Sequence, residues 1–334
     1  MKMISKGLIN DQNNSNFMFE YLSSVPTMQQ WFWSLKFNYN TSMIFGGCIQ
    51  KIQLFQFKNG YLKEIAQNFE KNANVCCLSS MNNSNFFISG NEEGIIRIRK
   101  CVGVNSPKGL IKLEVHISCI TSLLINQQDN IIFSSSMDHQ IIIWRKKNEW
   151  IHSQIIFGKI GKIYCLSLNQ SETQLIACGS CKYIIIIQKS KDCNYWYIIN
   201  KISLFQYGYR INFVDDSMFV FQPYCQSKLE VFVLNLDTKK FTKTKDIDVF
   251  CDSQTDNCFF PIQFVNRKQS ILINKNGNYI NILQLNNFHN FTLIQSINFN
   301  TQCLYGTISN DGEYLVTWNS LQECIQIRKF QEQK

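Results

Sequence analysis

Residues 116–144 read HISCITSLLINQQDNIIFSSSMDHQIIIW. Three short apolar runs stand in this stretch, at Ile120–Ile125, Ile131–Phe133 and Ile141–Trp144. Isoleucine-rich runs of this length, separated by polar residues, are typical of β-strands. Asn126–Asn130 separates the first two runs, and Asn and Asp tolerate the left-handed backbone that tight turns require. The stretch therefore predicts three consecutive strands joined by tight turns.

The same arrangement recurs along the chain at a nearly constant spacing. One core-facing residue opens the third strand of each unit, and these residues are Ile52, Ile96, Ile141, Ile184, Val231, Ile280 and Ile325. The steps between them are 44, 45, 43, 47, 49 and 45 residues. A more variable fourth strand follows, for example at 61–68, 150–157 and 291–297. A repeat of about 40–45 residues holding four strands is typical of a propeller blade, so we expect an all-β, seven-bladed β-propeller.

The composition is that of a folded chain with a substantial core. Hydrophobic residues make up 45% of the 334 residues and charged residues 17%, which argues against disorder. Only 4 Pro and 15 Gly are present, which excludes collagen-like and proline-rich classes. No segment shows sustained helical spacing of apolar residues, and no apolar run approaches the roughly 20 residues needed to span a bilayer.

The two ends of the chain are expected to close the ring. The seventh unit stops six residues after Arg328, which leaves no room for its fourth strand. Residues 16–22 (NFMFEYL) form an apolar-rich strand that belongs to no unit of its own. We expect this strand to complete the last blade. The chain then divides into a flexible lead-in over 1–15, a single propeller over 16–330 and a short tail over 331–334.

The third unit resembles the WD-repeat family, whose members fold as β-propellers, typically with seven blades. Ser134-Ser-Ser-Met-Asp138-His-Gln-Ile-Ile-Ile-Trp144 aligns with the family pattern Ser-Gly-Ser-x-Asp-x-Thr-Ile-x-Leu-Trp, and His116 stands four residues before Ile120. The resemblance implies a hydrogen-bonded structural tetrad of His116, Ser134, Asp138 and Trp144. The other units depart from the pattern, because Trp144 is the only tryptophan at its position and Arg145 replaces the Asp that follows it.

No residue constellation in the sequence indicates catalysis or a resident cofactor. Cys178-x-x-Cys181 has the spacing of a redox or zinc half-site, but zinc needs four ligands and no second close pair of Cys or His is evident. The four histidines, His116, His139, His152 and His289, give no ligand spacing. We therefore predict a protein that is not an enzyme, without metal or cofactor.

The function that these observations favour is that of a scaffold or adaptor, which presents one propeller face to protein or peptide partners within a multiprotein complex. Loops vary most in such a fold and carry its contacts. The candidate contact residues lie mainly in loops after the second strand of each blade, and they are Asn91, Glu92, Glu93, Met137, His139, Lys182, Lys228 and Lys275. The insertions 101–108 and 248–257 are further candidates.

The net charge of +9 leaves a second function open, the binding of nucleic acid or another anionic surface. The lysines that would serve it fall into two groups in the sequence: Lys239, Lys240, Lys243 and Lys245, and Lys146, Lys147, Lys159 and Lys162. The fourteen cysteines are spread singly along a long chain without a secretory signal, which predicts reduced thiols and an intracellular, cytoplasmic protein. Nuclear, cytoskeletal or ciliary association stays open.

Overall fold

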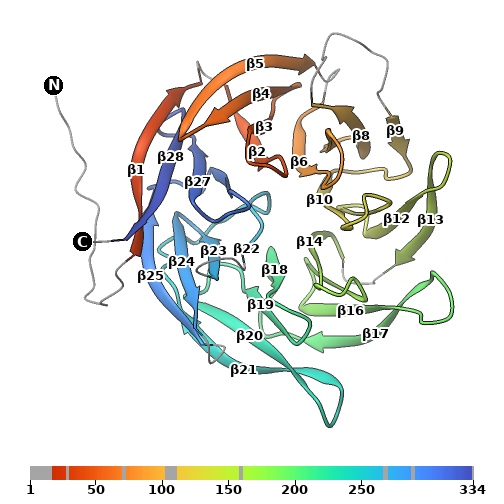
Figure 1. Cartoon of the computed structure of the whole chain (residues 1–334). Helices are drawn as coiled ribbons and strands as arrows, with labels where there is room; N and C mark the ends of the chain where they lie inside the picture. Colours follow the sequence, from red (N-terminus) through yellow and green to blue (C-terminus); the bar gives the residue numbers. More distant parts are fainter. Residues whose placement is uncertain are drawn as a thin grey trace.

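A computed structural model describes residues 17–27, 30–69, 73–101, 111–157, 161–265, 270–286 and 290–332. The described chain is all-β, and its 28 strands form seven four-stranded antiparallel sheets arranged in a ring (Figure 1). The prediction of a seven-bladed β-propeller is confirmed. All seven residues that mark the repeat are fully buried in third strands, and six of them are the second residue of their strand. Val231 is instead the fourth residue of its strand, where Leu229 is the first fully buried residue.

Each blade runs from an inner to an outer strand. Blade 1 holds β2 (Phe32–Phe37), β3 (Met43–Cys48), β4 (Lys51–Lys58) and β5 (Tyr61–Phe69); blade 2 holds β6 (Val75–Ser80), β7 (Phe86–Asn91), β8 (Ile95–Lys100) and β9 (Ile111–Glu114); blade 3 holds β10 (Ile120–Ile125), β11 (Ile131–Ser136), β12 (Gln140–Lys146) and β13 (Trp150–Phe157); blade 4 holds β14 (Ile163–Leu168), β15 (Gln174–Gly179), β16 (Tyr183–Lys189) and β17 (Trp196–Ser203).

The remaining blades follow the same order. Blade 5 holds β18 (Arg210–Phe213), β19 (Met218–Gln222), β20 (Lys228–Asn235) and β21 (Lys240–Asp248); blade 6 holds β22 (Gln263–Val265), β23 (Ile271–Asn276), β24 (Tyr279–Leu285) and β25 (Phe291–Asn298); blade 7 holds β26 (Leu304–Ile308), β27 (Tyr314–Asn319), β28 (Cys324–Glu332) and β1 (Phe17–Pro26).

Turns between the first two strands of several blades are built on one asparagine side chain. Asn126 Oδ1 accepts hydrogen bonds from the backbone nitrogens of Asn130 at 2.9 Å and Ile131 at 2.8 Å. Asp129 within this turn has a positive φ of 55°. Asn38 and Asn169 make the equivalent pairs of bonds in blades 1 and 4. The polar clusters therefore fix tight reversals, as their composition predicts.

The core lies between the blades rather than within any one of them. Seven clusters of buried apolar residues each join two neighbouring blades, and in one of them Ile88 and Ile96 of blade 2 pack with Ile132 and Trp144 of blade 3. A single blade cannot bury both of its faces, so each blade depends on its neighbours for stability.

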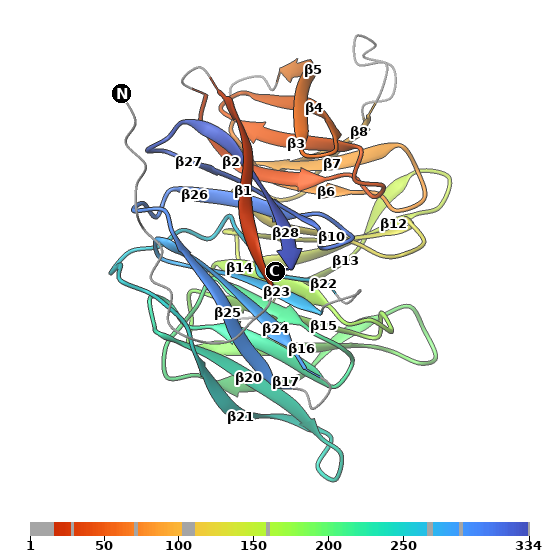
Figure 2. The ribbon, with the colours of Figure 1, turned by 60° about the vertical axis from the view of Figure 1, so that its left-hand side comes forward.

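Blade 7 is assembled from the two ends of the chain. β1 pairs antiparallel with β28 in a register that runs from Phe17 opposite Glu332 to Pro26 opposite Cys324. Figures 1 and 2 show the two strands side by side at the rim of the ring. The closing strand is thus present, and it extends beyond residue 22, where the sequence pattern ends. Residues 1–15 lie outside the described residues, and β28 continues two residues past position 330.

Candidate functional site

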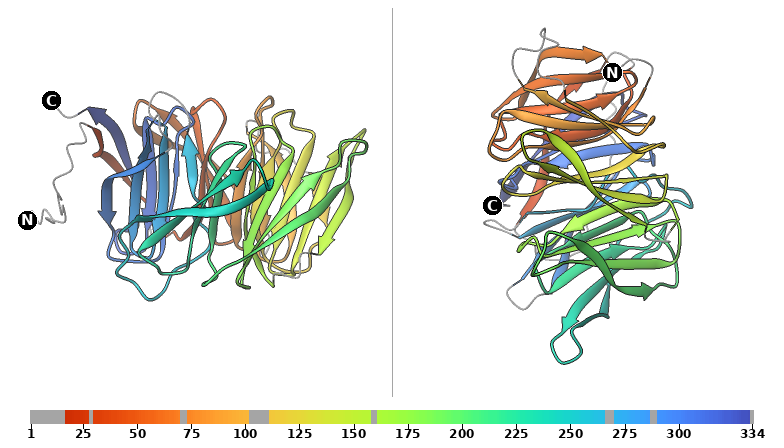
Figure 3. Two further views of the ribbon diagram at one scale, coloured as in Figure 1. Left: turned by 90° about the horizontal axis from the view of Figure 1, so that it is seen from below. Right: turned by 90° about the vertical axis from the view of Figure 1, so that its right-hand side faces the viewer.

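The connections between strands divide between two faces of the disc, which Figure 3 shows from the side. Because the strands of a blade alternate in direction, the loops after the second strand and the connections between blades emerge on one face, here called the upper face. The loops after the first and third strands emerge on the lower face. Most of the loop residues that the sequence singled out therefore belong to the upper face.

Four residues of blade 3 form a hydrogen-bonded set that reaches from the upper face into the core. His116 Nδ1 lies 2.7 Å from Asp138 Oδ2, and His116 Nε2 lies 2.9 Å from Ser134 Oγ. Trp144 Nε1 donates to the same Ser134 oxygen at 2.9 Å. The structure thus brings together the residues that the family resemblance assigns to a tetrad. Each buried polar atom in the set has a partner, which is the condition for burying such groups without loss of stability.

The Asp138 carboxylate also fixes the backbone of the upper face. Burial alone would raise the pKa of Asp138, but the interaction with His116 and the N–H groups of Ile117 and Gln140 outweigh it and lower that pKa. Ile117 N donates to Asp138 Oδ2 at 3.1 Å. The Ile117 side chain is 82% exposed. The tetrad therefore holds in place a connection that displays an apolar side chain to solvent.

Other apolar side chains are displayed on the same face. Phe205, in the connection between β17 and β18, is 91% exposed, and Leu321, in the loop between β27 and β28, is 63% exposed. Lys182 Nζ lies 5.9 Å from the centre of the Phe205 ring. Exposed apolar groups flanked by charged residues are a feature of protein-binding surfaces.

Four tyrosines pack against one another where blades 4 and 5 meet the upper face. The ring centres of Tyr164 and Tyr209 lie 4.7 Å apart, those of Tyr207 and Tyr224 5.0 Å, and those of Tyr209 and Tyr224 5.2 Å. All four remain partly exposed. The sequence did not predict this cluster. One signal was present: Tyr207 and Tyr209 stand two residues apart, directly before the inner strand that begins at Arg210.

The predicted loop residues of blade 2 have different roles. Glu92 and Glu93 are exposed on the upper face, and Glu92 accepts hydrogen bonds from the backbone and side-chain nitrogens of Asn74. Asn91 is buried instead, and its Oδ1 accepts from the backbone nitrogens of Glu93 at 3.2 Å and Ile95 at 2.8 Å. Asn91 therefore shapes the turn and does not present its side chain to a partner, which corrects the expectation for this residue.

The loop residues of blades 3 to 5 lie nearer to solvent. His139, Lys182 and Lys228 are exposed, and Met137 is partly exposed. His139 adopts a positive φ of 73° in a turn closed by its backbone N–H. Lys228 forms an exposed ion pair with Asp248, so this lysine is tied to the segment 248–257 that the sequence also singled out.

The expectation for Lys275 is wrong. This residue does not lie in a loop but within β23, and its side chain is fully buried. Its ammonium group contacts Asp256, which also binds Arg210. The apolar run that marks β23 in the sequence ends at Ile273, but the strand continues through Asn274 to Asn276 because these polar side chains find partners inside the protein.

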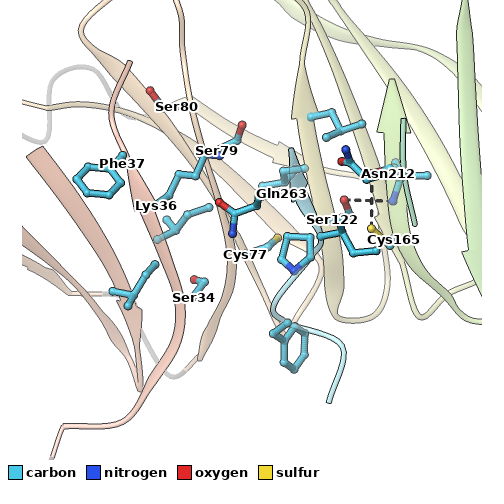
Figure 4. Close-up of a pocket in the computed structure, with 18 of the residues that line it drawn as sticks. Ser34, Lys36, Phe37, Cys77, Ser79, Ser80, Ser122, Cys165, Asn212 and Gln263 are labelled. Atoms are coloured by element: carbon cyan, nitrogen blue, oxygen red, sulfur yellow. Dashed lines mark hydrogen bonds between the residues drawn. The ribbon is translucent and has the colours of Figure 1, made fainter. Parts of the chain in front are cut away.

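A cavity of about 350 Å³ occupies the centre of the ring and is lined by the inner strands. Figure 4 shows small polar and thiol side chains from neighbouring blades around it, including Ser34, Cys77, Ser122, Cys165 and Gln263. Among the described residues, no aspartate, glutamate or histidine lines it. The lining offers hydrogen-bonding groups together with the titratable side chains of Lys36, Tyr164 and three cysteines.

The second group of lysines named from the sequence, from Lys146 to Lys162, does not lie on a single surface. Lys146 and Lys147 lie on the lower face, where they line a cavity of about 410 Å³ together with Arg145 and Lys189. Lys162 precedes β14 on the upper face, which corrects the grouping by sequence proximity. Lys159 lies outside the described residues. In the first group, Lys239 lies in the turn before β21 and Lys240 is the first residue of that strand. Lys243 forms ion pairs with Glu230 and Asp246.

The cysteines form no metal centre in the described segments, where no group of three or more His, Cys, Asp or Glu is placed to hold an ion. Cys178 is buried in β15, and Cys181 lies partly exposed in the following turn. His289 lies outside the described residues. No helix in the described part of the chain is long and apolar enough to cross a bilayer.

The ring of seven four-stranded blades makes the chain a β-propeller protein. The family model described as "WD domain, G-beta repeat" matches residues 108–145, a segment that contains the whole tetrad. No curated protein has a significant match to the chain. The match covers one repeat, and together with the seven blades it supports a WD-repeat propeller; such propellers are generally non-catalytic and typically act as protein-interaction scaffolds.

Proposed function

We propose that the protein is a non-catalytic scaffold that binds a protein or peptide partner with its upper face, as part of a multiprotein complex in the cytoplasm. The observation that carries the proposal is the display of Ile117, Phe205 and Leu321 on one face of a rigid ring. A partner that covers these side chains would remove apolar surface from water, which favours association. The tyrosine cluster supports the same face, because tyrosine is enriched at the centres of binding interfaces.

The test compares two faces of the same molecule. Tagged wild-type protein and the double variant Ile117→Asp/Phe205→Asp are used to capture partners from cells, and binding of each captured partner is then measured with purified proteins. Leu236→Asp is the matched control, because Leu236 is equally exposed on the lower face. We expect the double variant to weaken binding at least tenfold, equivalent to about 1.4 kcal/mol, and the control to bind normally. Equal binding by all three proteins would contradict the proposal.

The second candidate function, anion binding, is favoured by one observation on the lower face. Arg145, Lys146, Lys147 and Lys189 line the same cavity, and burial lowers the pKa of Arg145, whose Nη2 donates to the Asn194 carbonyl oxygen at 2.6 Å. Glu172 also lines this cavity, but the four cations outnumber its single carboxylate, so an anion would meet a net positive lining.

Salt dependence distinguishes this candidate from non-specific association. If RNA binds here, its affinity should fall steeply with salt. Lys146→Gln/Lys147→Gln should then reduce the slope of log K against log salt by about 0.7 for each phosphate that the variant no longer binds. Lys239→Gln/Lys240→Gln removes the same charge at another lower-face loop and should leave the slope unchanged. Binding that does not respond to salt would remove this candidate.

A further inference from the structure

Two cysteines from neighbouring blades meet at the upper face. Cys76 lies in β6 of blade 2 and is buried, whereas Cys119 directly precedes β10 of blade 3 and is partly exposed. The Sγ atom of Cys119 lies 3.3 Å from the Sγ atom of Cys76. The two inner strands are adjacent in the ring (Figure 1). The two thiols are therefore in direct contact across a blade boundary.

The surrounding structure holds this contact in place. Cys77, the next residue along β6, packs its sulfur against the Ile120 carbonyl oxygen at 3.5 Å. The Cys119 carbonyl oxygen accepts a hydrogen bond from Met137 N at 3.0 Å. Both thiols are thus anchored to regular strands and loops. A disulfide needs its sulfurs about 2.05 Å apart, so only a small movement of the side chains separates this pair from bonding distance.

We propose that Cys76 and Cys119 are an oxidisable thiol pair, which hydrogen peroxide converts into a disulfide that links blade 2 to blade 3. The partly exposed Cys119 sulfur attacks one peroxide oxygen, the O–O bond breaks, and Cys119 becomes a sulfenic acid as water is released. The Cys76 sulfur then attacks the Cys119 sulfur, the S–O bond breaks, and the hydroxyl group leaves as a second water with the proton of Cys76. Two thiols lose two electrons and two protons, and the peroxide is reduced to two water molecules.

The environment of the two sulfurs favours this order of steps. The hydrogen bond with Cys119 and burial both raise the pKa of the Cys76 thiol, so Cys76 keeps its proton while the more accessible Cys119 meets the oxidant. Because Cys76 already touches Cys119, a sulfenic acid formed there has its resolving thiol at contact distance. A neighbouring thiol of this kind protects a sulfenic acid from further oxidation.

The link would lie at the base of two candidate contact loops. Asn74, two residues before Cys76, binds Glu92 through its backbone and side-chain nitrogens, and the loop of Met137 hydrogen-bonds to Cys119 itself. A disulfide would couple these loops to each other. Any effect of that coupling on a partner rests on the proposed function, whereas formation of the disulfide does not.

The test maps the disulfide without a partner. Full-length protein is reduced, freed of reductant, treated with a small excess of hydrogen peroxide, alkylated and digested under non-reducing conditions for mass spectrometry. We expect a linked peptide pair containing Cys76 and Cys119, which disappears on reduction. Cys119→Ser should abolish it, and Cys193→Ser, which removes an exposed cysteine in blade 4, should retain it.

Wild-type protein alone suffices to overturn the proposal, so the result does not depend on how well a variant folds. If Cys119 is oxidised to a sulfinic acid, or joined to another cysteine, while Cys76 remains free to alkylate after unfolding, the pair is not an oxidisable unit. A rise in the thermal midpoint on oxidation that reverses on reduction would support it, because a cross-link between residues 76 and 119 restricts the unfolded chain.

Discussion

Arg210 binds Asp256 with both of its terminal nitrogens: Nη1 donates to Oδ2 at 2.5 Å and Nη2 to Oδ1 at 3.1 Å. Both side chains are buried, and so is Lys275, which contacts the same carboxylate. Burial alone would raise the pKa of Asp256, but the two cations outweigh it and hold that pKa below its ordinary value. One carboxylate therefore compensates two buried cations and joins β18, the connection before β22, and β23.

We expect Asp256→Asn to destabilise the propeller strongly. The substitution keeps the shape of the side chain but leaves two buried cations without a counter-charge, and breaking a buried ion pair in this way costs about 3–5 kcal/mol. The free energy of unfolding, measured in urea, should fall by that amount. Asp248→Asn in the same segment is the control: Asp248 pairs with Lys228 at the surface with its side chain 85% exposed, and loss of such a pair changes stability by at most about 1 kcal/mol. Similar losses in both variants would contradict the role assigned to Asp256.

The fold was predictable because it rests on a local signal repeated seven times. An alternating apolar strand needs only the identity of its own residues, and a turn built on Asn126 or Asn169 needs only a side chain that accepts hydrogen bonds from its own loop. Ring closure was predictable because the last blade lacked a fourth strand and the N-terminal strand belonged to no other blade. The other units lack the tryptophan and aspartate that are typical of the family, but they keep the alternating strands and the constant spacing.

The site was less predictable because its contacts join residues that are far apart in the sequence. The sequence favours a loop position for Lys275, because a lysine after an apolar run is usually exposed. Its partners are distant in the sequence: Arg210 stands in blade 5 and Asp256 in the connection before β22. The packing of Tyr164 against Tyr209 is also non-local. The tetrad was accessible to sequence reasoning only because its four residues lie within one repeat and follow the pattern of a known family.

Asp138→Ala tests whether the tetrad supports the fold. Removal of the carboxylate leaves the buried His116 Nδ1 without its partner, and an unsatisfied buried group costs about 1–3 kcal/mol. The urea midpoint should fall accordingly. His139→Ala, at the exposed neighbouring position, should leave the midpoint close to that of the wild type. A wild-type midpoint for Asp138→Ala would show that the hydrogen bonds contribute nothing to stability.

Deletion of residues 1–25 should lower the thermal midpoint sharply. The deletion removes almost all of β1 and exposes the edge of β28, along with the Phe330 ring, which stacks on Phe17 and packs at a tilt against Phe19. An open edge also provides a template for pairing between molecules, so the truncated protein should aggregate on heating. Deletion of residues 1–15 alone keeps β1 and serves as the control. If the two deletions have the same midpoint as the full chain, β1 does not close the ring.

Alkaline pH should destabilise the protein through its buried cysteines. Seven cysteines are buried and have a raised pKa, which is about 11 for Cys101 and Cys165 and about 12 for Cys258. Burial is the main cause in six of them, whereas in Cys76 the hydrogen bond with Cys119 comes first and burial second. In the unfolded chain a thiol loses its proton near pH 8.5. Above that pH the unfolded state binds fewer protons than the folded state, so the stability present below pH 8.5 is lost as the pH rises, by up to about 1.4 kcal/mol per pH unit for each thiol.

Lys36, Lys245 and Lys275 act in the opposite direction, because burial lowers their pKa values, that of Lys275 to about 8. At Lys275 the unfolded state binds more protons than the folded state between about pH 8 and 10.4, and the other two lysines have the same effect below about pH 10.4, which favours folding as the pH rises. Seven thiols outweigh three lysines, so the net slope should be negative. The measurement is the urea midpoint at pH 7.5, 8.5 and 9.5 with reductant present, and Cys258→Ala should make the decline shallower. A midpoint that stays level or rises to pH 9.5 would show that these sulfurs are not held as protonated thiols in the folded ring.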